Sequence, residues 1–297
     1  MAQATGEIHV DHLGLVRQAG QLYTPNARGI SPLHLLLSSR LYNVDAFDEL
    51  LSTYEVPSIS SFQSCVDSHG RTLLHWACYY RRDVRTLNLL CHLCSHPGVS
   101  DIYDSSGYTP LHTATRFASE DATRLLLDGV RGDTHGGEVV YLIKPADARL
   151  STLPKKRRRC LPIHLAAQRS DASFVDMVYR HMRATASASQ KSDAASGVKR
   201  EASVNPLLER DSRGWTPLMH AIRHVRKAQL TMMLAADEEE EGGLPGVSID
   251  VVHALVNAAA SDGTTPLMLG EKKKMPAPYE PISILSGFVF QFSLLFV

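Results

Sequence analysis

The chain has 297 residues, room for two ordinary domains or one elongated solenoid, and its 31 basic residues balance 31 acidic ones. A net charge of zero gives no global field that would draw the protein to nucleic acid or to an anionic membrane. Hydrophobic residues make up 44% and charged residues 21%, which is ordinary for a folded soluble protein.

The cysteines and the N-terminus indicate a reducing compartment. Five cysteines in a chain of this length are too few, and odd in number, for a disulfide framework. The first 20 residues show no basic segment followed by an apolar one, so we expect no secretory signal. The cytosol or the nucleus is therefore the expected location.

One short string returns six times along the chain. Its copies are NARGISPLHLLL from Asn26, DSHGRTLLHWAC from Asp67, DSSGYTPLHTAT from Asp104, KRRRCLPIHLAA from Lys156, DSRGWTPLMHAI from Asp211 and SDGTTPLMLG from Ser261. Aligning the copies gives one reference position in each repeat, and these positions are Ser31, Thr72, Thr109, Leu161, Thr216 and Thr265.

Each part of the string has a physical role. The leading Asp or Asn opens a turn by bonding to its own backbone two residues on. The following glycine can take a positive φ at the turn, and these glycines are Gly29, Gly70, Gly107 and Gly214. The reference residue is then predicted to cap a helix, with Pro at the first helical position, where a missing N–H costs nothing. Thr72, Thr109 and Thr216 are the predicted N-caps, with Ser31 as a variant.

Apolar residues after each string predict an inner helix, a turn and an outer helix. In the third repeat, Leu111 and Ala114 mark the inner helix, and Ala122, Leu125 and Leu126 mark the outer one. The same offsets recur in the other repeats. Such a helix pair cannot bury its apolar face alone, so stacking against neighbouring pairs is expected to bury it.

These strings resemble the ankyrin signature, an acidic residue and a glycine followed by T-P-L-H-x-A. The resemblance covers about residues 9–270 and implies an all-α solenoid of helix-turn-helix units joined by β-hairpin-like loops. Repeats of the family are roughly 33 residues long, whereas the reference positions here are 37 to 55 residues apart, so loop insertions are expected. The fourth repeat lacks both the turn glycine and the Thr cap, so we expect its hairpin to be the least well formed.

The predicted organisation follows from this frame. It comprises an N-terminal capping half-repeat at 1–25, repeats 1–3 at 26–129, a loop insertion at 130–154, a degenerate repeat 4 at 155–182, a disordered Ser/Ala-rich insertion at 183–205, repeats 5–6 at 206–270 with an acidic loop at 237–246, and a basic then hydrophobic tail at 271–297. Gly270 and the basic run after it are expected to stop repeat 6 before an outer helix forms.

The resemblance also implies where a partner binds, on the surface formed by the hairpin tips and the inner helices. Positions one before, seven after and eight after the reference position carry aromatic and basic side chains, the types that dominate binding energy. The candidate partner-binding residues are Arg71, Tyr79, Tyr80, Tyr108, Arg116, Phe117, Arg169, Trp215, Arg223 and His224. Because this row is aromatic and basic, we expect a protein partner, such as an extended peptide, that presents acidic and apolar groups.

Histidines and cysteines raise the question of a metal. His34, His75, His112 and His164 occupy one motif position, where the resemblance implies a bond back to the hairpin and the Thr. Stacked repeats are about 10 Å apart, so these rings cannot converge on one ion. The sequence CHLCSH at 91–96 could be half of a zinc site, but no second half stands at the usual spacing, and reduced thiols are the favoured interpretation. We expect no metal and no cofactor.

A basic run in the fourth repeat resembles a monopartite nuclear localisation signal, and it consists of Lys155, Lys156, Arg157, Arg158 and Arg159. A solvated loop is the competing interpretation. Nucleic-acid binding is less favoured, because no aromatic residues are interleaved with the charges.

The uncharged stretch 282–297 would span about 24 Å as a helix, short of a hydrocarbon core of about 30 Å. It is interpreted as a strained membrane anchor, as a cover for the open apolar end of the stack, or as the product of a truncated gene. A membrane-anchored protein with a cytosolic ankyrin arm, such as a channel or an acyltransferase, is thus the alternative to a soluble monomer.

No nucleotide-binding loop, nucleophile elbow or kinase signature is present, so we expect no enzyme. The leading hypothesis is a non-catalytic adaptor, cytosolic or nuclear.

Overall fold

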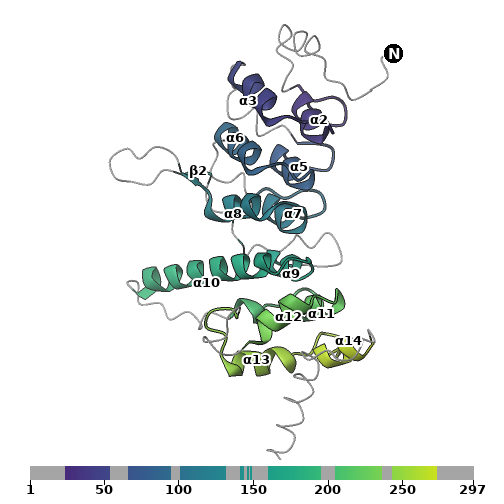
Figure 1. The fold of residues 1–297 in the computed structure, drawn as a ribbon, viewed down its shortest axis with the longest axis vertical. Helices are drawn as coiled ribbons and strands as arrows, with labels where there is room; N and C mark the ends of the chain where they lie inside the picture. Colours follow the sequence, from purple (N-terminus) through teal and green to yellow (C-terminus); the bar gives the residue numbers. More distant parts are fainter. Residues whose placement is uncertain are drawn as a thin grey trace, which may run out of the picture. The chain divides into compact units, whose positions relative to one another are not determined.

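The computed structural model describes residues 24–53, 66–94, 101–131, 141–143, 146, 148, 160–194, 205–235 and 243–272. The chain divides into two compact units, Met1–Asp147 and Ala148–Val297. Each unit is a stack of helices, of which α10 in the second unit is the longest in the described residues (Figure 1). The architecture is therefore the expected all-α solenoid, and the described part adds one short two-stranded ladder to it.

The first unit contains three helix pairs. The inner helices are α2 (Pro32–Ser38), α5 (Leu73–Tyr79) and α7 (Pro110–Phe117), and the outer helices are α3 (Val44–Thr53), α6 (Val84–Cys94) and α8 (Glu120–Asp128). Inner helices pack against inner helices and outer against outer, and each inner helix α5 and α7 also packs against its own outer helix. The three helix pairs of this unit are thus stacked on one another.

The second unit continues the pattern with longer insertions. It contains α9 (Pro162–Ala166), α10 (Ser173–Ala194), a 3₁₀ turn η2 (Pro206–Leu208), α11 (Pro217–Arg223), α12 (Lys227–Leu234), α13 (Ile249–Val256) and α14 (Pro266–Lys272). Helix α11 packs against α9, α12 and α14, so the inner helices of repeats 4, 5 and 6 are neighbours.

The turn glycines and the helix caps have the predicted conformations. Gly29, Gly70, Gly107 and Gly214 all have φ between +70° and +80°. The Thr72 and Thr109 hydroxyl oxygens accept the amide protons of His75 and His112, and Thr216 accepts that of Met219. The alanines at the predicted inner-helix site are fully buried, which lets adjacent inner helices approach closely, and these are Ala77, Ala114, Ala166 and Ala221.

Three predicted boundaries differ from the structure. The Ser/Ala-rich stretch predicted to be disordered is helical through Ala194, because it contains no Pro or Gly up to that point and follows a helix anchored by the buried Met182 and Ala186. The insertion predicted as a loop begins with a strand, β1 (Val130–Arg131), which pairs antiparallel with β2 (Tyr141–Ile143). Helix α13, with Val252 and Leu255 buried, lies in a segment for which no helix is predicted.

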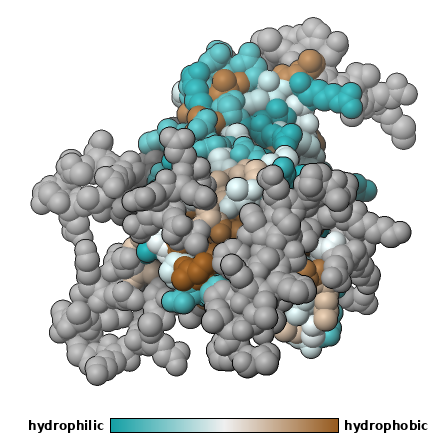
Figure 2. Space-filling model, turned by 60° about the horizontal axis from the view of Figure 1, so that its bottom comes forward, coloured by the Kyte–Doolittle hydropathy of each residue, from teal (hydrophilic) through white to brown (hydrophobic). Residues whose placement is uncertain are grey.

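A few large hydrophobic side chains are exposed on the described surface. Figure 2 shows separate hydrophobic groups among hydrophilic ones on the face that it presents. The largest exposed aliphatic residues are Leu35, Leu41, Val84, Val225, Ile249 and Met268. Single exposed apolar residues are normal on soluble proteins, so these positions do not by themselves identify a binding surface.

Candidate functional site

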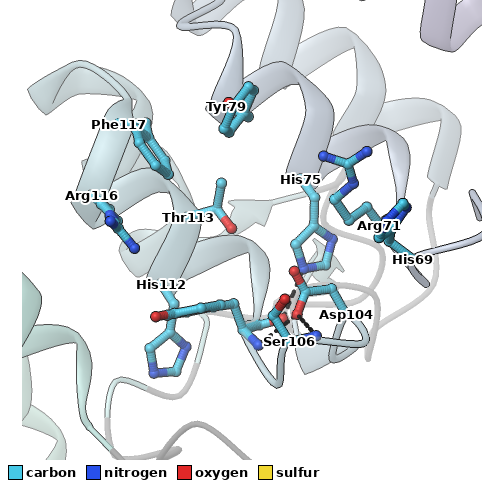
Figure 3. Close-up of a pocket in the computed structure, with 11 residues that line it drawn as sticks. His69, Arg71, His75, Tyr79, Asp104, Ser106, His112, Thr113, Arg116 and Phe117 are labelled. Carbon is cyan, nitrogen blue, oxygen red and sulfur yellow. Dashed lines mark hydrogen bonds between the residues drawn. The ribbon is translucent and has the colours of Figure 1, made fainter. Parts of the chain in front are cut away.

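A concave pocket of about 190 Å³ lies in the first unit, between the second and third repeats (Figure 3). The hairpins and the inner helices α5 and α7 supply its walls. Half of the predicted partner-binding residues line it, namely Arg71, Tyr79, Tyr108, Arg116 and Phe117. The sequence predicts these residues on one surface, and the structure shows that they line one pocket.

Tyr79 and Phe117, two rings of an aromatic cluster, lie at the upper side of the pocket in Figure 3. The ring centroids of Tyr79 and Phe117 are 5.0 Å apart, and those of Tyr79 and Tyr80 are 5.2 Å apart, both edge to face. Tyr79 is 46% exposed and Tyr80 37% exposed, although both carry large rings. The Arg116 guanidinium lies 5.1 Å from the Phe117 ring centroid, within range of a cation–π contact.

The arginines around this cluster are not equivalent. Arg71 is held by Asp67, with its Nε and Nη2 both 2.7 Å from the carboxylate Oδ2, so its charge is neutralised locally. Arg81 uses its Nε to donate to the Phe117 carbonyl, and neither Arg81 nor Arg116 forms an ion pair within the described part of the chain. Two uncompensated positive charges thus flank the exposed rings.

The Asp67 carboxylate is buried and accepts more hydrogen bonds than the turn that the sequence predicts for it requires. Its Oδ1 accepts the amide protons of His69 and Arg71, and its Oδ2 accepts the Trp76 indole proton at 3.0 Å. Burial acts to raise the pKa of Asp67, but these hydrogen bonds and those of the Arg71 guanidinium hold it below its usual range.

The prediction that Trp215 is an exposed anchor is wrong. Trp215 is 7% exposed and packs with Met219, Ala258 and Ala260. The two alanines lie in the hairpin that follows α13. Because the sequence analysis predicts no helix at α13, it could not place these alanines against Trp215. The Arg223 guanidinium, 5.3 Å from the indole centroid, covers this ring.

The remaining predicted residues of the second unit lie outside the pocket. The Arg169 guanidinium lies 3.7 Å from the Phe174 ring centroid, and His224 is exposed at the end of α11. The ten candidates therefore separate into six in the first unit and four in the second. Five of the six in the first unit line one cavity.

The motif histidines have the predicted structural role. Nδ1 of each ring accepts the amide proton of the reference residue three positions earlier, at 3.1 to 3.3 Å, in His34, His75, His112 and His164. His75 Nε2 donates to the Tyr108 carbonyl of the next hairpin at 3.0 Å, and His164 Nε2 donates to Glu209 O. The bond that Nδ1 accepts requires the neutral ring, because a proton on Nδ1 would remove the acceptor. Burial lowers the pKa of His34 to about 4, and burial together with the neighbouring His220 lowers that of His164 to about 4.

No group of His, Cys, Asp or Glu in the described residues has the arrangement of a metal site. Cys91 is buried, and burial raises its pKa to about 12, so its thiol is protonated at neutral pH. Cys78 is likewise buried with a raised pKa.

Several predicted features fall outside the described residues. They are the capping segment up to residue 23, the basic run 155–159, most of the acidic loop, and the tail from 273, including the stretch 282–297 on which the membrane alternative depends. Within the described residues, no helix combines the length and the apolar character needed to cross a membrane.

Residues 106–134 match the family model of the ankyrin repeat. Among curated proteins, no sequence matches the chain. Among solved structures, the ankyrin repeat domain of Bcl-3, described as a unique member of the IkappaB protein family, is similar to 87% of this chain over 86% of its own length, with 18% sequence identity and a TM-score of 0.49.

Proposed function

Because residues 106–134 match the ankyrin-repeat model and the described helices stack in pairs, we propose that the chain is a non-catalytic ankyrin-repeat scaffold that binds a protein partner on the inner-helix face of its first unit. The observation that carries this proposal is the aromatic cluster of Tyr79, Tyr80 and Phe117, which is partly exposed beside a pocket and is flanked by two arginines that form no ion pair within the described residues. The family match points to a protein-interaction module and indicates no enzyme family.

The energetics of exposed rings support a binding role. Part of the surface of Tyr79 and of Tyr80 stays exposed in the free protein, so a partner gains apolar contact without first separating these rings from a core. Two tyrosines and a phenylalanine next to arginines have the composition of an interface hot spot. Because no described acidic side chain pairs with Arg81 or Arg116, a partner segment with acidic and apolar side chains complements this surface. Cytosolic or nuclear localisation, as a monomer, remains part of this proposal.

Truncating the cluster is expected to remove partner binding. The double substitution Tyr79→Ala and Phe117→Ala removes two contacting rings, and each truncation is expected to cost on the order of 2 kcal/mol of binding free energy, a roughly 30-fold loss in affinity. Partners cross-linked to the wild-type chain are identified and quantified by mass spectrometry, and the same measurement is made on the variant.

A matched control places two substitutions on exposed positions of the outer helices. Asn88→Ala on α6 and Arg124→Ala on α8 change side chains of comparable exposure away from the pocket and are expected to retain all partners. The proposal is wrong if the Tyr79/Phe117 variant, folded by circular dichroism, retains every partner that the control retains.

A further inference from the structure

The repeats build the same small compartment with different contents. In the second repeat, the Trp76 indole occupies a space between the Asp67 carboxylate and the motif histidine of the preceding repeat. Its Nε1 donates to Asp67 Oδ2 at 3.0 Å, and its ring lies 5.1 Å from that of His34, edge to face. Arg71 and Tyr80 enclose the ring at 4.9 and 5.5 Å. We call this compartment the ring site.

The fifth repeat fills its ring site in the same way. His220 stands at the position equivalent to Trp76, four residues after the reference Thr. Its Nε2 donates to Asp211 Oδ2 at 3.1 Å, and its ring lies 5.4 Å from that of His164 and 5.5 Å from that of Trp215. An aromatic N–H bound to the second carboxylate oxygen is therefore the shared feature of the two filled sites.

The third repeat has the compartment but not the ring. Asp104 Oδ1 accepts the amide protons of Ser106 and Tyr108 at 2.8 Å, as in the other hairpins, but Oδ2 has no hydrogen-bond donor in the described residues. The equivalent of Trp76 is Thr113, whose hydroxyl donates to the Thr109 carbonyl. The pocket described above is this unfilled ring site, with His75, Asp104 and Thr113 around it and Phe117 on its wall (Figure 3).

The first repeat has neither the carboxylate nor the ring. Asn26 replaces the Asp there, and its Oδ1 accepts the same two amide protons, from Arg28 and Ile30. The residue at the ring position is Leu35, which is 56% exposed and carries no N–H. The side-chain amide of Asn26 is thus sufficient to form the turn. In repeats 2 and 5, where an Asp stands at this position, its second carboxylate oxygen accepts the N–H of an aromatic ring. Asp104 has the second oxygen and lacks the donor.

We propose that the third repeat's ring site is completed in trans, by a tryptophan side chain of the protein partner whose indole N–H donates to Asp104 Oδ2. This inference rests on the proposed function and specifies which side chain of the partner enters the pocket. The equivalent compartment of the second repeat encloses the whole Trp76 indole, and the cavity in the third repeat is about 190 Å³. Both tryptophans of the chain, Trp76 and Trp215, are already buried, so the indole comes from another molecule.

An indole fits this site better than an imidazole. The ring of His220 needs a second partner, and Gln168 of the preceding repeat donates to its Nδ1 at 3.2 Å. The equivalent of Gln168 in the pocket is Tyr79, an aromatic ring without an amide. An indole has one N–H and no ring acceptor, so Asp104 alone satisfies it and the surrounding rings contact its faces. Acidic residues beside the tryptophan would then meet Arg81 and Arg116.

The test is a titration of the full ¹⁵N-labelled chain with N-acetyl-tryptophanamide, followed through the amide resonances of Tyr108 and Thr113. We expect saturable shifts with a Kd in the millimolar range, as suits a single side chain. The analogue methylated at the indole nitrogen is expected to bind about 10-fold more weakly, because it leaves the Asp104 carboxylate without its donor. Absence of saturable shifts, or equal affinity for the two ligands, overturns the proposal.

Three variants localise the effect. Thr113→Trp reproduces the second repeat, fills the site from within and is expected to abolish the shifts, whereas Thr113→Val is expected to change the Kd less than about 2-fold. Asp104→Asn keeps the turn, as Asn26 does, and is expected to remove the preference for the unmethylated ligand. Should Thr113→Trp fail to fold, the Asp104→Asn comparison decides. Undiminished binding by a folded Thr113→Trp variant counts against the inference.

The partner experiment separates this inference from the proposed function. If the Tyr79/Phe117 variant loses a partner that Thr113→Trp retains, the surface binds proteins but the ring site does not receive their indole. If neither variant loses a partner, the proposed function itself fails. Loss of the same partner in both, together with the ligand titration, supports both.

Discussion

Acidification from pH 7 to pH 4.5 is expected to destabilise the folded chain by several kcal/mol, before the carboxylates of the hairpins are protonated. Burial holds the pKa of His34 and of His164 at about 4, against 6.5 for the unfolded chain. Burial also lowers the pKa of His75. Between pH 6.5 and 4 the unfolded state therefore binds protons that the folded state does not, so stability is present above pH 6.5 and is lost as the pH falls through this window. For His164 alone the full shift corresponds to on the order of 3 kcal/mol.

The hydrogen bonds give the physical reason for this sign. Nδ1 of each motif histidine accepts an amide proton, so a proton added there breaks a buried bond. Urea unfolding at half-unit pH steps measures the slope, and His164→Gln is expected to reduce that slope by about one proton while lowering stability at pH 7. The carboxylates do not confuse the result, because the pKa values of Asp67 and Asp211 are lowered below 3.8, outside the window. A free energy of unfolding that stays constant from pH 6.5 to 4.5 would contradict this prediction.

The sequence predicted the features that each repeat determines locally. The caps at Thr72 and Thr109, the positive φ of Gly29 and Gly70, and the buried Ala114 depend on residues within about ten positions of one another. Six copies of one string made these features visible, because every copy repeats the same local chemistry. The Tyr79 and Phe117 positions followed from the same frame.

Features that depend on neighbouring repeats could not be predicted in this way. Arg82 donates to the carbonyl groups of Leu37 and Ser39 in the preceding repeat, and Arg226 donates in the same manner to Gln168 O. Both arginines lie ten residues after their reference Thr, so a comparison of the second and fifth repeats would have revealed the shared position. The function of each depends on a carbonyl more than 40 residues away, and no local pattern shows that contact.

Trp215 illustrates the same limit at the candidate site. The residue just before the reference Thr is partly exposed in the second and third repeats, where it is Arg71 and Tyr108. In the fifth repeat it is Trp215, which is buried because the following hairpin packs Ala258 and Ala260 against its ring. A long insertion separates that hairpin from Trp215 in sequence, so its contact could not be predicted from spacing. The open ring site was missed for a related reason, since it is defined by the absence of a ring at Thr113 and becomes visible only beside Trp76 and His220.

Replacing Gly29 by alanine is expected to cost about 3 kcal/mol or more of folding free energy, whereas Gly263→Ala is expected to cost about 1 kcal/mol. Both glycines have a positive φ, +72° and +78°. An alanine at either position is therefore destabilised by adopting the left-handed backbone conformation. A Cβ on Gly29 would in addition overlap the Val66 carbonyl oxygen and lie 2.9 Å from the Asp67 Cα, both of which are backbone atoms, whereas a Cβ on Gly263 meets nothing within 4 Å.

The cause is the hydrogen bond that joins consecutive hairpins. The Ser68 amide donates to the Arg28 carbonyl at 2.7 Å, and Ser105 donates to His69 O and Ser261 to Arg213 O in the same way. Each bond draws a hairpin onto the glycine of the previous one, so a side chain there separates the two. Gly70, where the Cβ would lie 3.3 Å from the Ser105 nitrogen, is expected to be intermediate and provides a control within the same unit. Hydrogen exchange at the Ser68 amide should accelerate in Gly29→Ala and remain unchanged in Gly263→Ala. Equal losses of stability in the three variants would show that φ strain, and not the contact between hairpins, selects glycine at these turns.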